Sequence, residues 1–350
     1  MQFIKPDVNV NFIGRRYLAF GLSGAMILIS IISLILHGGP KLGVDFKGGT
    51  LIQVKFLTPV KIEDIKAGMR EVGIEQTSVQ RFGEQSNHEY LIRTDSSTVT
   101  HEGSQEEIKK ALDAKTGGQA EIQRVEMVGP KVGQDLREKA LFAMFYALLF
   151  ITIYISGRFE FKWVISGIMT AALIGAVYVF TIFKVSIPFL IVAALIVSLV
   201  LFWFLELKYA MGAIVALIHD VTITVGVFSL FGKEFTLAII AALLTIIGYS
   251  LNDTIIVFDR IRENLRKYHK NPLDTILNRS INETLSRTIL TSGTTLIVVV
   301  ALFVLGGGII HDFAFALLVG IGVGTYSSIF VASPILLAWQ GKQPKAKGKP

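Results

Sequence analysis

The sequence predicts a polytopic α-helical membrane protein with about eight spans and one ferredoxin-like α+β domain outside the membrane. Of the 350 residues, 52% are hydrophobic and only 17% are charged, whereas soluble domains usually carry about a quarter charged residues. The mean hydropathy is +0.58, and several apolar runs reach roughly 20 residues, the length that crosses the hydrocarbon core of a bilayer. These properties argue against a disordered chain, a collagen and a water-soluble enzyme.

The first predicted element is a transmembrane helix within residues 1–37. An apolar run from Tyr17 to Leu36 follows Arg15 and Arg16, so the run could be a signal peptide or a first span. No small-x-small cleavage site follows it, and a polar segment begins at once. We therefore expect a retained helix with its N-terminus in the cytoplasm.

Residues 38–135 carry most of the acidic side chains and no run long enough to span, so they are expected to form a soluble domain. Alternation of apolar and polar residues predicts strands, and apolar residues three and four apart predict helices. Strands are expected near 52–56, 77–82, 88–93 and 120–128, with one helix from Ile62 and a second opened by a capping box at Ser104 that turns Ile108 and Leu112 inward. The order β-α-β-β-α-β is that of a ferredoxin-like fold.

From residue 136 to residue 340 the chain is expected to form a helix bundle, and a basic tail follows at 341–350. Apolar segments lie near 139–157, 163–182, 187–205, 209–230, 235–258, 288–305 and 313–339. If the N-terminus is inside, Lys and Arg gather on the cytoplasmic side, and the short outer loops hold only Lys184 and Lys233. The positive-inside rule thus places both termini in the cytoplasm and the soluble domain in the periplasm of a cell inner membrane. The net charge of +7 is then topological and needs no nucleic-acid partner.

An internal repeat is visible at an offset of 46 residues. The segment 159–163 resembles the segment 205–209 through a shared Glu-x-Lys turn, and the similarity continues into the following helices. Chance similarity between apolar helices is the alternative, but the shared turn favours duplication of a helical hairpin. The extra hairpin, at about 163–205, has one basic residue and no acidic residue, so we expect a structural, peripheral role.

Polar residues inside the predicted spans are the candidate functional site. His219 and Asp220 lie mid-span, Asn252 and Asp253 lie in the next span, and Arg287 begins the span after that. Because each charge in hydrocarbon costs about 2.5–3.5 kcal/mol, such residues need a partner or a role. A buried ion pair with nearby hydroxyl groups suits a proton-driven conformational machine. Snorkelling of Arg287 and a purely structural ion pair at Asp253 are the alternatives.

No cofactor is expected. The Gly-Gly segments lack the strand-to-helix context and the Lys of a phosphate loop, and the His residues are scattered rather than clustered. The absence of cysteine excludes disulfides, thiolate metal sites and thiol catalysis. Gly320, Gly322 and Gly324 in the last span are expected to allow close helix packing.

Five motifs occur in order along nearly the whole chain. They are Val44-Asp-Phe-Lys-Gly-Gly-Thr50, Val128-Gly-Pro-Lys-Val-Gly133, His219-Asp220, Gly248-Tyr-Ser-Leu-Asn-Asp253 with the following Asp259-Arg-Ile-Arg-Glu-Asn264, and Arg287-Thr-Ile-Leu-Thr-Ser-Gly-Thr-Thr295. Together they resemble the SecF family of protein-export membrane subunits, within the resistance-nodulation-division superfamily. In the first motif, Asp45, Gly48, Gly49 and Thr50 match the family's motif in the outer domain.

The resemblance implies a function and partners. It implies a subunit that works with SecD, and with YajC as an additional component, beside the SecYEG channel and uses the proton gradient to help pull preproteins outward. It also implies that Asp253 and Arg287 take part in proton conduction. The family normally has six spans, so the additional pair falls between Phe161 and Leu207. The second repeat copy retains the His-Asp pair, whereas the first has Leu173 and Ile174, so function is assigned to the second copy.

Two other functions are alternatives. A stand-alone proton-driven exporter of the same superfamily would need two pseudo-symmetric halves and two large outer domains, and this chain has one of each. An intramembrane protease would use Asp220 and Asp253 as paired carboxylates, but the flanking Gly-x-Gly-Asp and second Tyr-Asp elements are absent from the sequence.

Overall fold

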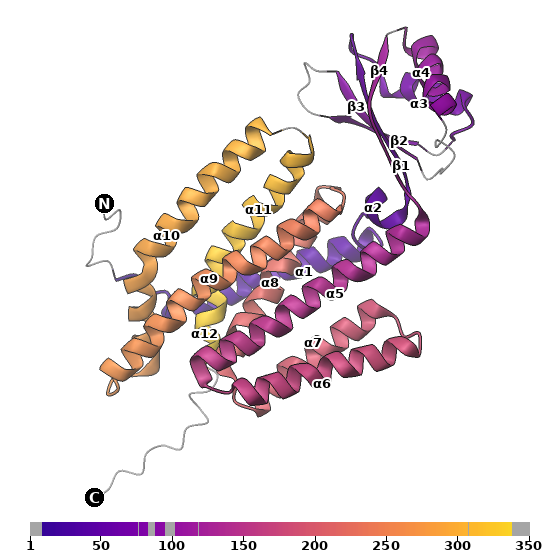
Figure 1. Cartoon of the computed structure of the whole chain (residues 1–350). Helices are drawn as coiled ribbons and strands as arrows, with labels where there is room; N and C mark the ends of the chain where they lie inside the picture. The colour runs from indigo at the N-terminus through magenta and orange to yellow at the C-terminus, as the bar shows by residue number, and fades with distance from the viewer. Residues whose placement is uncertain are drawn as a thin grey trace, which may run out of the picture.

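A computed structural model describes residues 9–75, 77–82, 88–94, 102–117, 119–306 and 308–337. It consists of a bundle of long helices with a small α+β domain standing above one end (Figure 1). The predicted basic tail at 341–350 and the first eight residues lie outside the described residues.

Eight helices in the described part of the chain are long and apolar enough to cross a membrane, as predicted. They are α1 (Arg16–Leu36), α5 (Pro130–Ile155), α6 (Trp163–Ile182), α7 (Ile187–Phe204), α8 (Lys208–Leu230), α9 (Leu237–Lys267), α10 (Leu273–Leu305) and α11 (Gly308–Ser327). A 3-10 turn at Ile13–Arg15 precedes α1, and π-helical turns at Ser156–Glu160 and Ser328–Ala332 extend α5 and α11, the latter followed by α12 (Ser333–Ile335). The protein is therefore a polytopic α-helical membrane protein.

The outer domain has the predicted ferredoxin-like order. It contains β1 (Gly49–Phe56), α3 (Ile62–Glu71), β2 (Thr77–Phe82), β3 (Glu89–Thr94), α4 (Glu102–Thr116) and β4 (Ala120–Val128), and the short helix α2 (Val44–Lys47) precedes it. The sheet order is β2-β3-β1-β4, with every neighbouring pair antiparallel. Alternate β1 residues Ile52, Val54 and Phe56 are buried, as the sequence pattern predicts, and the inward faces of α3 and α4 complete the core.

The predicted capping box at Ser104 is wrong. Helix α4 begins at Glu102, so Ser104 lies inside the first turn rather than at the N-cap. The helical period fixes which face is buried but not the residue at which the first turn begins. Ile108 and Leu112 are buried as expected, since the helical period is unaffected by where the helix begins.

Helix α8 occupies the centre of the bundle and packs against α1, α9 and α11. The α6–α7 hairpin lies at the edge, beside α5 and on the opposite side from α10 (Figure 1). Large apolar side chains of this hairpin face outward, among them Val164, Ile168, Phe189 and Phe204. The edge position expected for the extra hairpin is therefore the one in the structure.

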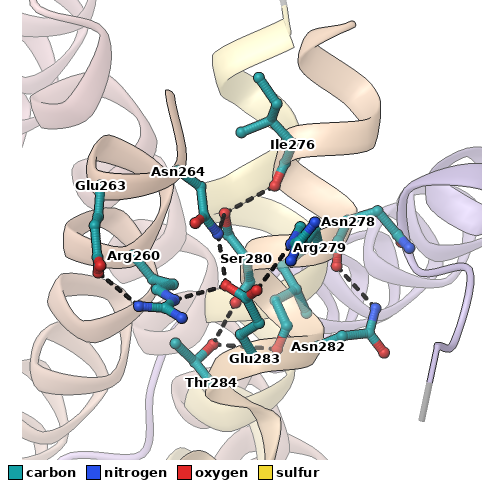
Figure 2. A network of polar contacts seen from close by, with 11 residues as sticks. Arg260, Glu263, Asn264, Ile276, Asn278, Arg279, Ser280, Asn282, Glu283 and Thr284 are labelled. Carbon is teal, nitrogen blue, oxygen red and sulfur yellow. Dashed lines mark hydrogen bonds and ion pairs between the residues drawn. The ribbon is translucent and has the colours of Figure 1, made fainter. Parts of the chain in front are cut away.

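The elbow between α9 and α10 is held by a polar network (Figure 2). The Glu283 carboxylate accepts hydrogen bonds from Arg260 Nε at 2.6 Å, Arg279 Nε at 2.8 Å and Asn264 Nδ2 at 2.7 Å. Asn264 is buried and also donates to Ser280 Oγ at 3.0 Å. This network fixes how α10 turns back along α9 and so fixes the register of the residues deeper in both helices.

Helices α9 and α11 approach closely at two of the three glycines that the sequence singled out. An added Cβ at Gly324 would lie 2.9 Å from Ser250 Cβ, and one at Gly320 would lie 2.2 Å from Ile246 Cδ1. An added Cβ at Gly322 meets nothing within 4 Å. Small-residue packing is thus confirmed for Gly320 and Gly324, and the expectation for Gly322 is wrong because it lies on an exposed face of α11.

The difference between two of these glycines gives a test of the α9–α11 contact. Gly324→Val should force the helices apart and destabilise the protein by about 1–3 kcal/mol. Gly322→Val introduces the same β-branched residue into the same helix without a neighbour to displace. In thermal melts of the purified protein, Gly324→Val should therefore melt several degrees lower than Gly322→Val. Equal melting temperatures would contradict the close contact.

Candidate proton-relay site

Asp220 lies in the middle of α8 with an exposed fraction of 0%. Its carboxylate accepts hydrogen bonds from His219 Nδ1 at 2.8 Å, Ser250 Oγ at 2.6 Å and Ser327 Oγ at 2.8 Å. Ser250 belongs to α9 and Ser327 to α11, so the carboxylate joins three helices. An ionised group at this depth is tolerated only when such donors replace water.

A chain of polar groups continues from His219 towards α1. Its Nε2 lies 3.1 Å from Ser23 Oγ, which lies 3.2 Å from Tyr326 Oη, and the Tyr326 hydroxyl donates to the carbonyl of Ala19 at 2.8 Å. The Tyr326 hydroxyl has one hydrogen, which it donates to that carbonyl. Ser23 must therefore be the donor in the hydrogen bond between the Ser23 and Tyr326 hydroxyls. His219 Nε2 must then be the donor to Ser23. The proton shared between His219 Nδ1 and Asp220 Oδ1 then lies on one or the other of these two atoms.

Asp253 forms a second, less saturated centre on α9. Its exposed fraction is 1%, yet among the described residues it accepts a single hydrogen bond, from Ser292 Oγ of α10 at 3.1 Å. Thr325 Oγ1 of α11 donates to Ser292 Oγ at 2.8 Å. A carboxylate has about four lone-pair positions, so Asp253 retains acceptor capacity that no described side chain fills.

The two centres are neighbours along the same pair of helices. Ser250, which binds Asp220, is three residues from Asp253 on α9, and Ser327 is two residues from Thr325 on α11. Residues three apart lie on one face of a helix. The Ser250 donor to Asp220 and the Asp253 carboxylate therefore lie on one face of α9.

The predicted direct ion pair between Asp253 and Arg287 is absent from the described structure, although the positive charge of Arg287 still acts on the Asp253 carboxylate. Arg287 is exposed on the outer face of α10, while Asp253 turns inward to Ser292. Ser292 and Arg287 are five residues apart, which separates them by about 140° around a helix of 3.6 residues per turn. Asn252 is also exposed, so the predicted set divides into a buried part (His219, Asp220, Asp253) and an exposed part (Asn252, Arg287).

The exposed residues belong to a polar stripe on the spans α9 and α10. We define this stripe as Thr245, Asn252, Arg287 and Thr294, all exposed. Lipid tails cannot satisfy an Arg or an Asn at the depth of a span. The α10 helix is also the least buried of the eight spans. This face therefore has the composition of a protein contact rather than a lipid contact.

The Gly-Gly motif ties the outer domain to the bundle. Asp45 Oδ2 accepts a hydrogen bond from the Leu237 backbone N–H at 2.8 Å and so occupies the N-terminus of α9. Gly48 has φ +81°, and an added Cβ would lie 2.8 Å from Pro130 Cα at the start of α5. Gly49 has φ +120°, and Thr50 is fully buried in β1. The motif thus has a structural role at the junction, away from the buried carboxylates.

A buried acid that sequence reasoning missed strengthens this junction. Glu234 precedes α9 and forms ion pairs with Lys41 at 3.3 Å and with Arg93 of β3. Burial lowers the pKa of Arg93, and the carboxylates of Asp312 and Asp45 oppose this shift. The sequence offered no period or motif that joins residues so far apart.

The sequence did not identify several of the hydroxyl groups that hydrogen-bond near the buried carboxylates. Ser23, Ser250, Ser327, Thr325 and Tyr326 supply the polar contacts described above. The only available signal was their position in spans that also carry acids, and small hydroxyl residues are equally common in helix packing.

The fold and the site define an integral membrane protein with one outer α+β domain and two buried carboxylates in a helix bundle. Family models match residues 33–60 (SecD/SecF GG Motif) and residues 107–199 and 174–342 (Protein export membrane protein SecD/SecF, C-terminal). The chain belongs to the SecD/SecF family. The last two matches are to the same family model and overlap, as expected for a duplicated hairpin.

Relatives and solved structures agree with this assignment. The chain is 42% identical to the protein translocase subunit SecF of Magnetococcus marinus, over 96% of this chain and 94% of that protein. It is also 42% identical to that of Desulfurispirillum indicum, over 95% and 92%. The crystal structure of SecDF from Thermus thermophilus, a translocon-associated membrane protein, matches with a TM-score of 0.74 and 31% identity, over 97% of this chain. The chain spans only 40% of that longer protein.

Asp220 accepts more hydrogen bonds than Asp253, so substitution by Asn should destabilise the folded protein more at Asp220 than at Asp253. Asp220 Oδ1 faces His219 and Oδ2 faces Ser250 and Ser327, so the NH₂ group of Asp220→Asn must face one or two donors in place of an acceptor. Each disrupted hydrogen bond to a charged group costs about 1.5–3 kcal/mol. Asp253→Asn disturbs one bond at most. Thermal melts should therefore show a much larger destabilisation for Asp220→Asn. A larger loss for Asp253→Asn would contradict the assigned contacts.

Proposed function

We propose that this protein uses the proton motive force, together with SecD, to promote preprotein translocation through the SecYEG channel and release on the periplasmic side. Its family membership makes it a membrane subunit of protein export. The observation that carries the proton-coupled part is Asp253, a carboxylate buried in a span with one hydrogen-bond donor.

The two carboxylates have different roles in this proposal. Asp220 is held by three donors from three helices, so a change in its protonation would break contacts on several helices at once. Asp253 can take up a proton with the loss of one contact, that with Ser292. Gain or loss of charge at Asp253 alters the α9–α10 contact, and α9 is linked to the outer domain through Asp45. Proton transfer can thus bias the position of the outer domain.

The polar stripe on α9 and α10 is assigned to SecD. SecDF from Thermus thermophilus is a single longer chain of which this protein matches about two fifths, so the remaining part would correspond to a separate partner here. A second subunit on the stripe would supply hydrogen-bond partners to Asn252 and Arg287 in place of lipid. A stand-alone exporter is less favoured, because nothing would then cover the stripe.

The orientation follows from charge. The α9–α10 elbow carries Arg260, Arg266 and Arg279 and is assigned to the cytoplasm, and the outer domain at the opposite end is assigned to the periplasm. We place the protein in the cell inner membrane with both termini inside. YajC and translocating preproteins are further proposed partners. No bond of a substrate is broken and no cofactor is required in this scheme.

The first functional prediction concerns Asp253. Asp253→Asn should preserve folding but abolish stimulation of export by the proton gradient, because an amide cannot exchange protons. Asp259→Asn is the matched control, since Asp259 is also on α9 but forms a half-exposed pair with Arg158 that contributes little. Export assays in spheroplasts should show wild-type stimulation in the control alone. Wild-type stimulation by Asp253→Asn would refute the assignment.

The orientation can be tested by labelling, because the natural chain has no cysteine. Lys110→Cys, on an exposed face of α4, should react with an impermeant thiol reagent added to intact spheroplasts. Lys267→Cys, at the end of α9, should react only after lysis. The reverse pattern would invert the topology.

The partner surface can be tested with a bulky side chain. Thr294→Trp on the polar stripe should reduce the amount of SecD that co-purifies by at least about fivefold, since overpacking an interface costs about 1–3 kcal/mol. Ile168→Trp makes a comparable change on the exposed face of α6 and should have no effect. Equal recovery of SecD with both variants would place the interface elsewhere.

A further inference from the structure

We propose that a cavity at the outer end of the bundle binds one anionic phospholipid. The cavity has a volume of about 710 Å³, within the range of about 300–1,000 Å³ typical of small-molecule sites. It lies between the outer halves of α5, α8 and α9, beside the segment that follows α1 and leads into the Gly-Gly motif. Neither buried carboxylate lines it.

The floor of the cavity is apolar. Phe46 of α2 and Phe235 before α9 lie at its outer part, and Met144, Val225 and Leu243 line it deeper in the bundle. Phe46, Phe235 and Leu243 are buried, and Met144 and Val225 are partly buried. An apolar lining of this kind suits an acyl chain rather than a hydrated solute.

The rim of the cavity is cationic. Lys41, Lys47 and Arg137 line it, and its described lining contains no Asp or Glu. Lys41 forms an ion pair with Glu234, but Lys47 and Arg137 form no ion pair in the described part of the chain. The cavity therefore pairs an apolar floor with two uncompensated positive charges at the membrane surface.

This pattern fits an amphiphile with a negative headgroup and an apolar tail. Anionic phospholipids have this chemistry. Basic pockets between membrane helices on the cytoplasmic side recognise such headgroups, and this cavity has the same pairing of charge and apolar surface at the outer side. The basic N-terminal region of a signal peptide would be repelled by the same rim. The commitment to a lipid, rather than an exported polypeptide, thus follows from charge.

The site also gives the extra hairpin a physical role. Pro188, at the start of α7, also lines the cavity. The hairpin contains no acidic residue that could neutralise the rim. We therefore assign to it the closure of one wall of the lipid site.

The test is a titration of the full chain in detergent with phosphatidylglycerol, followed by native mass spectrometry. The double variant Lys47→Gln/Arg137→Gln should lower the affinity by roughly fivefold for each charge removed. Lys61→Gln/Lys131→Gln removes the same net charge from exposed residues at the same end of the molecule and should leave it unchanged. Val225→Trp, which fills the floor and keeps the rim, should also lose the lipid. Unchanged melting temperatures would show that each variant is folded.

Competition identifies the source of the bound group. Phosphatidylcholine and excess inorganic phosphate should fail to displace phosphatidylglycerol. Displacement by phosphate would overturn the proposal, because the tail would then be irrelevant. If both double variants lost the same amount of affinity for phosphatidylglycerol, binding would depend only on the net charge of the protein. That result would also overturn the proposal. Displacement by an uncharged apolar peptide, independent of the two cations, would assign the cavity to a polypeptide instead.

Discussion

Burial of the Asp220 carboxylate is the constraint on which the centre of the bundle depends. A charge that has left water must receive hydrogen bonds from protein, and here the donors come from α8, α9 and α11. To supply them, α9 and α11 must approach closely, which requires Gly324 opposite Ser250. His219 also contacts Ser23 of α1, so α1 must lie close to α8 at this point. The arrangement of the central spans is thus specified by polar contacts as well as by apolar packing.

The same arrangement leaves Asp253 with one donor and places it between the saturated centre and the polar stripe. Asp220 therefore holds the helices together, and Asp253 is the group that exchanges a proton. Asp45 at the N-terminus of α9 and the Glu234 ion pairs link the outer end of the same helix to the outer domain. A charge change at Asp253 therefore lies on a helix that reaches both the membrane interior and the domain outside it.

Sequence patterns predicted the spans and strands well because hydrophobic length and alternation depend on local residues. The strand at 120–128 and the helices at 163–182 and 209–230 required no knowledge of tertiary contacts. The Asp253–Arg287 pair was wrong because depth in the membrane does not fix rotation about a helix axis. The hydroxyl groups that follow Arg287, Ser292 among them, were expected beside the buried acid. The donors to Asp220 were not assigned, since a hydroxyl in an apolar span serves packing or hydrogen bonding equally well until its neighbours are known.

The central claim is that Asp253 changes its protonation state inside the membrane while the folded bundle persists. Infrared difference spectroscopy of the reconstituted protein across a pH titration measures this directly through the carbonyl band of a protonated carboxyl group. The account predicts a titrating band that disappears in Asp253→Asn and survives in Asp259→Asn. A titrating band that is unchanged in Asp253→Asn, or no such band in the wild type, would contradict it.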